Sequence, residues 1–187
     1  PNELAQIAGR AGRHMNSGTF GVTGEAGTLS EEVVEAITEN RFIPVKKLFW
    51  RNSRLQFGTT TALISSLEKH TENEWLTRVR ESEDLGALKS LVEDAEIQAR
   101  ASDGGSVRLL WDVCQIPDFR SISNSEHSDL LGTIYNYLHE KGQIPQEWLA
   151  KQINRIDKTT GDIDALSKKL AYIRTWTYVS QRKDWLE

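Results

Sequence analysis

Apolar residues recur every three or four positions along most of this 187-residue chain, which is the spacing of amphipathic helices. The first such segment spans residues 1–15. One short stretch, residues 19–23, instead carries β-branched and aromatic residues between glycines. That composition predicts a short strand, and residues 24–27 predict a turn after it. No later segment has a convincing strand pattern.

From Thr28 onward the pattern predicts one helix after another. Thr28 and Glu31 form a capping box, the usual signal for a helix start. A second capping box joins Ser123 to Glu126, and Gly142 stands where a left-handed cap ends that helix. The further predicted helices span residues 60–70, 84–100, 106–116, 145–156 and 162–181. The sequence therefore predicts a mainly α fold.

Composition narrows the classes of protein to consider. The chain is 38% hydrophobic, which suffices for one sizeable core or two small ones. Its single cysteine, Cys114, cannot form an internal disulfide, and no apolar run is long enough to span a membrane. We therefore expect a reducing compartment and no membrane partner. The net charge of -4 argues against holding nucleic acid by bulk positive charge, so any such site must be local.

The strongest motif lies in residues 6–13, Gln-Ile-Ala-Gly-Arg-Ala-Gly-Arg. Arg10 and Arg13 are three positions apart and can both reach one polyanion. Gly9 and Gly12 are costly in a helix, so their presence suggests close approach of another backbone or of a ligand. The alternative is an ordinary amphipathic helix whose arginines are solvated.

This stretch resembles motif VI of superfamily 2 helicases, whose pattern is Gln-x-x-Gly-Arg-x-Gly-Arg. The resemblance implies that Arg10 and Arg13 reach across a cleft between two RecA-like domains to the phosphates of ATP, with Arg13 as the arginine finger. It also implies that Gln6 positions the γ-phosphate or the attacking water. All five specified positions of the pattern match, in Gln6, Gly9, Arg10, Gly12 and Arg13. The ATP-binding residues that the resemblance implies are Gln6, Gly9, Arg10 and Arg13.

The rest of the chain is similar to the C-terminal region of the mitochondrial degradosome RNA helicases and their bacterial relatives. This similarity rests on the order of the parts. It implies an ATP-dependent helicase whose helical region guides a single strand of RNA or DNA, in a bacterial cytoplasm or, alternatively, a mitochondrial matrix. The implied domains are a remnant of the second RecA-like domain, a helical sub-bundle with connector, and a C-terminal sub-bundle, over residues 1–27, 28–102 and 103–187. A hinge is expected at residues 102–105.

Binding of ATP and Mg²⁺ needs sequence motifs that this chain does not contain. No Gly-x-x-x-x-Gly-Lys-Ser/Thr loop and no Asp-Glu box occur in the 187 residues. We therefore expect the chain to be a fragment that binds neither ATP nor Mg²⁺ and is inactive alone, with the enzyme activity belonging to the full-length protein.

Residues 41–57 are the most plausible nucleic-acid surface, because cations alternate there with aromatic residues that can stack on bases. The residues singled out are Lys46, Lys47, Trp50, Arg51 and Arg54, near Phe42, Phe49 and Phe57. The alternative is that the aromatic residues are core residues joining the ATPase domain to the helices. A smaller candidate is the cationic face of the last predicted helix, which includes Lys168, Lys169 and Arg174.

Other residues suggest no chemistry of their own. The four histidines do not stand at metal-ligand spacing, so no metal site is predicted, and Cys114 in an apolar helix is expected to be a buried hydrophobe. Four tryptophans on apolar stripes are expected to anchor the core or an interface: Trp111, Trp148, Trp176 and Trp185. Two rival functions stay open. One is a helical interaction module that recruits a ribonuclease, and the other is an ATPase that remodels complexes without unwinding.

Overall fold

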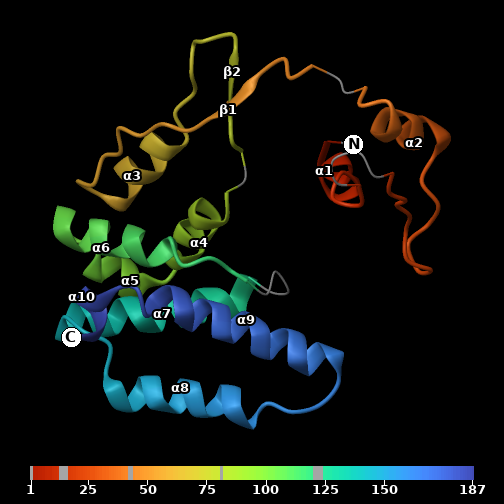
Figure 1. Ribbon diagram of the computed structural model, residues 1–187. Helices are drawn as coiled ribbons and strands as arrows, with labels where there is room; N and C mark the ends of the chain where they lie inside the picture. Colours follow the sequence, from red (N-terminus) through yellow and green to blue (C-terminus); the bar gives the residue numbers. More distant parts are fainter. Residues whose placement is uncertain (1, 13–16, 42–43, 81, 120–123) are drawn as a thin grey trace. The chain divides into compact units, whose positions relative to one another are not determined.

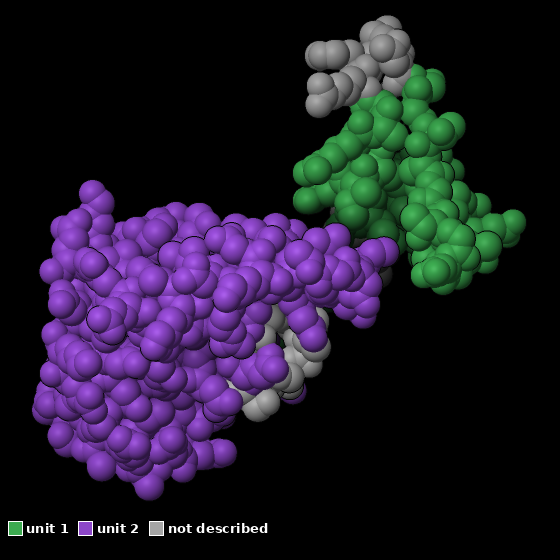
Figure 2. All heavy atoms as spheres, turned by 90° about the horizontal axis from the view of Figure 1, so that it is seen from below, with its two compact units in different colours: residues 1–48 green, residues 49–187 purple. Residues whose placement is uncertain are grey.

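The computed structural model describes residues 2–12, 17–41, 44–80, 82–119 and 124–187 of the chain (Figure 1). The fold is mainly α, as predicted. The chain forms two compact units, residues 1–48 and residues 49–187 (Figure 2). This division differs from the expected boundaries after residues 27 and 102.

The first unit contains two short helices, α1 (Asn2–Ala8) and α2 (Glu31–Thr38). The helix predicted over residues 1–15 is shorter than expected, because α1 gives way at Gly9 to a tight turn in which the Arg10 amide donates to the Ile7 carbonyl at 3.2 Å. Helix α2 begins two residues later than predicted, since its N-cap is Ser30, whose hydroxyl accepts a hydrogen bond from the Val33 amide.

The strand predicted at residues 19–23 is wrong. Residues 17–23 have no regular secondary structure, although the turn after them is present, with the Ala26 amide donating to the Thr23 carbonyl at 3.0 Å. A strand needs a neighbour to satisfy its backbone groups, and the described residues of the first unit provide none.

The second unit starts with a small β–α–β element made of β1 (Leu48–Trp50), α3 (Thr60–Leu67) and β2 (Leu76–Arg78). The two strands form a parallel sheet, and the Val79 amide donates to the Trp50 carbonyl at 3.1 Å. That bond sets Trp50 opposite Arg78 and Phe49 opposite Thr77. The prediction of no strand beyond residue 23 is therefore wrong, because strands of three residues are too short to show alternation.

The remaining helices fill the predicted helical region. They are α4 (Glu83–Leu91), α5 (Ala95–Arg100), α6 (Gly104–Cys114), α7 (Asn124–Lys141), α8 (Gln146–Lys158), α9 (Ile163–Val179) and α10 (Lys183–Leu186). The single helix predicted over residues 84–100 is divided, since the Asp94 carboxylate accepts hydrogen bonds from the Glu96 and Ile97 amides and caps α5. Gly142 adopts the predicted left-handed conformation, with φ of 72°. The capping box at Ser123 lies outside the described residues.

One hydrophobic core extends across the expected hinge at residues 102–105. Helices α4, α6 and α7 pack against one another, and Leu88, Leu110 and Ile134 from these three helices are fully buried. Asp103 does not mark a flexible link but caps α6, accepting hydrogen bonds from the Gly105 and Ser106 amides at 2.8 and 3.1 Å. The residues before and after the predicted hinge therefore belong to one unit.

The tryptophans predicted as anchors do stabilise this core. Trp111, Trp176 and Trp185 are buried, and Trp148 is partly buried with its ring edge-on to Trp176 at a centroid distance of 5.7 Å. The Trp185 carbonyl also accepts a hydrogen bond from the Ile144 amide at 2.7 Å, which fastens α10 to the start of the α8 segment.

Candidate functional site

The segment of residues 6–13 begins in α1 and continues into the turn after it, in the first unit. Gln6 is on the helix and Arg10 is in the turn after it, and both side chains are exposed. Neither side chain makes a hydrogen bond or ion pair with another residue that the structure describes. Arg13 lies outside the described residues. The structure thus presents two of the three predicted catalytic side chains to solvent, where a ligand or another domain can reach them.

Gly18 makes a close backbone approach to this segment. A Cβ atom built on Gly18 would overlap the carbonyl carbon and oxygen of Ala11 and would stand 2.6 Å from the Gly12 nitrogen. Real Cβ atoms do not approach so closely, so only glycine fits here without movement. The chain after the motif therefore folds back against the peptide that immediately precedes Arg13.

An apolar groove follows the motif in the same unit. It has a volume of about 440 Å³ and lies between residues 18–22 and the α2 segment, where Leu29 and Val34 line it. The residues expected to form a strand thus leave an apolar face uncovered by described residues of their own unit.

The predicted nucleic-acid residues are divided by the structure. Lys46 and Lys47 are exposed in the first unit, and Arg54 is exposed in the second. Trp50 is partly buried, whereas its neighbour Phe49 is 81% exposed. Phe49 is therefore not part of the hydrophobic core formed by the described residues, and Phe42 lies outside the described residues.

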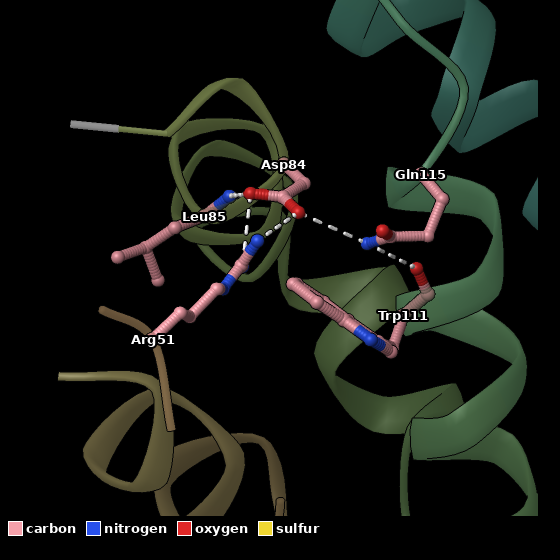
Figure 3. A network of polar contacts seen from close by, with 5 residues as sticks. All are labelled: Arg51, Asp84, Leu85, Trp111 and Gln115. Carbon is pink, nitrogen blue, oxygen red and sulfur yellow. Dashed lines mark hydrogen bonds and ion pairs between the residues drawn. The ribbon is translucent and has the colours of Figure 1, made fainter. Parts of the chain in front are cut away.

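Arg51 has a structural partner that sequence reasoning missed. Figure 3 shows its guanidinium paired with the Asp84 carboxylate through two hydrogen bonds of 2.7 and 3.0 Å. The same guanidinium lies 5.2 Å from the centre of the Trp111 ring. A charge held in this way is neutralised, so Arg51 is not available as a phosphate ligand in this conformation.

Asp84 is the centre of this polar network. Its carboxylate also accepts hydrogen bonds from the Leu85 amide at 2.8 Å and from the Gln115 side chain at 3.3 Å (Figure 3). Burial by itself raises the pKa of Asp84, but the hydrogen bonds from Arg51 and Ser82 and the charge of Arg51 outweigh it, and the pKa is lowered. The network therefore joins the segment after β1 to the start of α4 and the end of α6.

Trp75 is a second exposed aromatic residue that sequence reasoning did not single out. It lies just before β2 and is 66% exposed. The exposed cations Lys69 and Arg80 come from the segments before and after it. Trp75 stands in a polar stretch, Glu72 to Glu74, so no apolar periodicity marks it. Only the exposed fraction of its side chain identifies it.

Cys114 is buried, as predicted, and burial raises the pKa of its thiol far above the usual range. It is therefore a structural residue and not a nucleophile. Among the described residues, no cluster of three or more His, Cys, Asp or Glu side chains is arranged to hold a metal ion. None of the described helices has the length and apolar character needed to cross a membrane.

Comparison of the chain with protein-family models, with curated proteins and with solved structures finds no match.

Proposed function

We propose that this chain is the C-terminal part of an ATP-dependent nucleic-acid helicase that acts chiefly on RNA. The observation that carries the proposal is the match of residues 6–13 to motif VI, together with the exposed positions of Gln6 and Arg10. A surface helix that only needed solubility would carry Ala, Glu or Lys where this one has Gly9 and Arg10. The Gln6 and Arg10 side chains have no described partner. This suits residues that act only when another domain closes over them.

The chemistry of this role is electrostatic. In phosphoryl transfer, negative charge on the transferring oxygens is stabilised by a cation that engages on domain closure. Arg13 acts as the arginine finger, Arg10 binds a neighbouring phosphate oxygen, and Gln6 orients the γ-phosphate or the attacking water. Planar guanidinium groups suit phosphate oxygens because they donate two parallel hydrogen bonds.

The described residues of this chain match the phosphates of ATP but not Mg²⁺. Guanidinium and amide donors at the end of α1 match phosphate oxygens, but no described acidic cluster can hold a cation. The chain therefore supplies one side of a nucleotide site, and the intact protein supplies the residues that hold ATP and Mg²⁺.

The helical unit guides the unwound strand in this proposal. Lys46, Lys47 and Arg54 remain candidate phosphate ligands because they are exposed. Arg51 has a different role, since its ion pair with Asp84 fixes the segment after β1 to the helical core. We place the protein in the cytoplasm of a bacterium, with the mitochondrial matrix as the alternative.

The test is made on the intact protein that contains this chain. ATP hydrolysis is measured with and without single-stranded RNA and DNA, and strand displacement is measured on tailed duplexes. The proposal expects hydrolysis that nucleic acid stimulates, together with displacement that needs ATP. Absence of hydrolysis would contradict it, and hydrolysis without displacement would favour an ATPase that remodels complexes.

The second candidate function is a helical interaction module that recruits a ribonuclease. It is favoured by an exposed apolar stripe on α9, at positions that share one helix face: Ile163, Leu166, Leu170 and Ile173. The buried tryptophans no longer support it, since they belong to the core. This function expects Leu170→Glu to abolish binding of a purified exoribonuclease while ATP hydrolysis stays unchanged. If the parent chain binds no exoribonuclease, the candidate fails.

A further inference from the structure

Two exposed aromatic side chains flank one position of the small β1–β2 sheet. Phe49 is directly opposite Thr77 in the register set by the bond between Val79 and Trp50. Trp75 precedes Thr77 by two residues and belongs to the turn in which the Leu76 amide donates to the Asn73 carbonyl at 3.1 Å. Both aromatic residues are thus neighbours of Thr77, Phe49 across the sheet and Trp75 two residues earlier along the chain.

Phe49 and Trp75 are not anchors of the core of the second unit. Its other aromatic anchors, Trp111, Trp176 and Trp185, are buried in the core. Side chains alternate across a strand, so Phe49 points to the face opposite that of Trp50, which is partly buried. Phe49 is 81% exposed and Trp75 is 66% exposed, so described residues leave most of each side chain uncovered.

The same region carries unpaired positive charge. Residues 49–80 contain five Lys and Arg and three Glu. Asp84 neutralises Arg51 and Lys89 neutralises Glu68, so four cations and two Glu remain, a net charge of +2 in a chain whose net charge is -4. The side chains of Arg54, Lys69 and Arg80 are exposed and make no hydrogen bond or ion pair with a described residue. The Glu68 carboxylate is already paired with Lys89 at 2.6 Å. These three cations of residues 49–80 are thus free to meet a polyanion.

We propose that Phe49 and Trp75 form a platform on which bases of single-stranded nucleic acid stack, while Arg54, Lys69 and Arg80 bind its phosphates. The proposal rests on the proposed helicase function and names the site at which the helical unit meets the strand. Aromatic rings alternating with unpaired cations match the flat bases and charged backbone of a single strand.

The experiment measures the affinity of the intact protein for a fluorescently labelled single-stranded RNA by anisotropy. Phe49→Ala and Trp75→Ala are each expected to raise Kd by about 5-fold to 100-fold, the range found when one stacked base loses its aromatic partner. Trp75→Phe retains a ring and is expected to keep Kd within about threefold of the parent value, whereas Trp75→Leu keeps apolar area without a ring and is expected to behave like Trp75→Ala.

The matched control is Ile163→Ala on α9, whose side chain is 83% exposed and lies on another part of the unit. It removes exposed apolar surface and is expected to leave Kd unchanged. All variants are checked for an unchanged circular dichroism spectrum and urea midpoint, which their exposed positions predict.

Arg54→Gln and Arg80→Gln should raise Kd and reduce its dependence on salt concentration.

The outcomes separate this inference from the proposed function. If Phe49→Ala and Trp75→Ala bind RNA as tightly as the parent, while RNA still stimulates ATP hydrolysis, the platform is overturned and the helicase proposal stands. If Trp75→Leu binds as well as Trp75→Phe, apolar contact and not stacking holds the ligand, and the platform is likewise overturned. If the intact protein neither binds RNA nor hydrolyses ATP, both proposals fail.

Discussion

The Asp84 carboxylate accepts two hydrogen bonds from the Arg51 guanidinium, at 2.7 and 3.0 Å, across 33 positions of sequence. The pair joins the segment after β1 to the first turn of α4, and the carboxylate is the more buried partner, with 15% of its side chain exposed. A residue expected to bind phosphate is thus part of the structural framework. Its removal leaves a carboxylate partly buried without its main partner.

Arg51→Ala is expected to lower the free energy of unfolding by about 1–3 kcal/mol, because the Asp84 charge then lacks its bidentate donor. Chemical denaturation of the parent and the variant measures the difference. Lys89→Ala is the matched control, since it breaks an exposed ion pair with Glu68 and should cost at most about 0.5 kcal/mol. Equal losses for the two variants would contradict a structural role for Arg51.

Asp84 also predicts a dependence of stability on pH. Its pKa is lowered in the folded protein, so the folded state favours the carboxylate more than the unfolded state does, where the pKa is about 3.9. The stabilisation is therefore present above the unfolded pKa and is lost as pH falls through the folded pKa. The stability difference between the parent and Asp84→Asn should shrink as pH falls from about 6 to about 3. A difference that stays constant or grows would show that the carboxylate charge does not stabilise the fold.

Gly18→Ala is expected to disturb the segment of residues 6–13. The added Cβ would overlap the Ala11 carbonyl, so the backbone must shift, at a cost of about 1–3 kcal/mol. Gly21→Ala is the control, because nothing lies within 4 Å of a Cβ at that position. Hydrogen exchange of the Gly9 and Ala11 amides, which bond to the Ala5 and Ala8 carbonyls, should accelerate in the Gly18 variant only. Equal exchange in both variants would refute the close approach.

Leu88 belongs to the core that α4, α6 and α7 form, so its truncation should strongly lower the stability of the protein. Leu88→Ala is expected to lower the free energy of unfolding by about 2–5 kcal/mol, because its side chain is fully buried. Leu166→Ala on α9 makes the same chemical change at a side chain that is 54% exposed, and should cost less than about 0.5 kcal/mol. Urea denaturation measures both. Similar values would mean that α9 is covered or that Leu88 is not a core residue.

Helical periodicity predicted the helices that carry a long apolar stripe. The α6 and α7 segments carry long apolar stripes, and Gly142 ends α7 as expected because its φ is positive. The predicted strand at residues 19–23 failed because a strand depends on a neighbour, and β-branched residues alone do not provide one. The break between α4 and α5 had a local signal in Asp94, an N-cap residue that helical periodicity concealed.

The candidate sites show a second limit of prediction from sequence. The spacing of residues 6–13 identifies Gln6 and Arg10, because the motif is contiguous in sequence. Nothing in the sequence around Arg51 reveals that Asp84, far along the chain, neutralises it. Trp75 shows the converse, since an isolated Trp in a polar stretch gives no sign of whether it is buried or exposed. Pairing and exposure arise from tertiary structure, which a local pattern does not encode.

The proposed action of Arg10 and Arg13 on the phosphates of ATP is tested most directly by steady-state ATP hydrolysis of the intact protein with saturating RNA. Arg13→Ala is expected to reduce kcat by about 10³-fold or more while changing nucleotide affinity much less, and Arg10→Ala to reduce it by a smaller factor. Arg41→Ala is the control, because Arg41 is paired with Glu35 and Glu39 on the exposed surface of the same unit and should leave kcat unchanged. Unchanged turnover in Arg13→Ala would contradict the account.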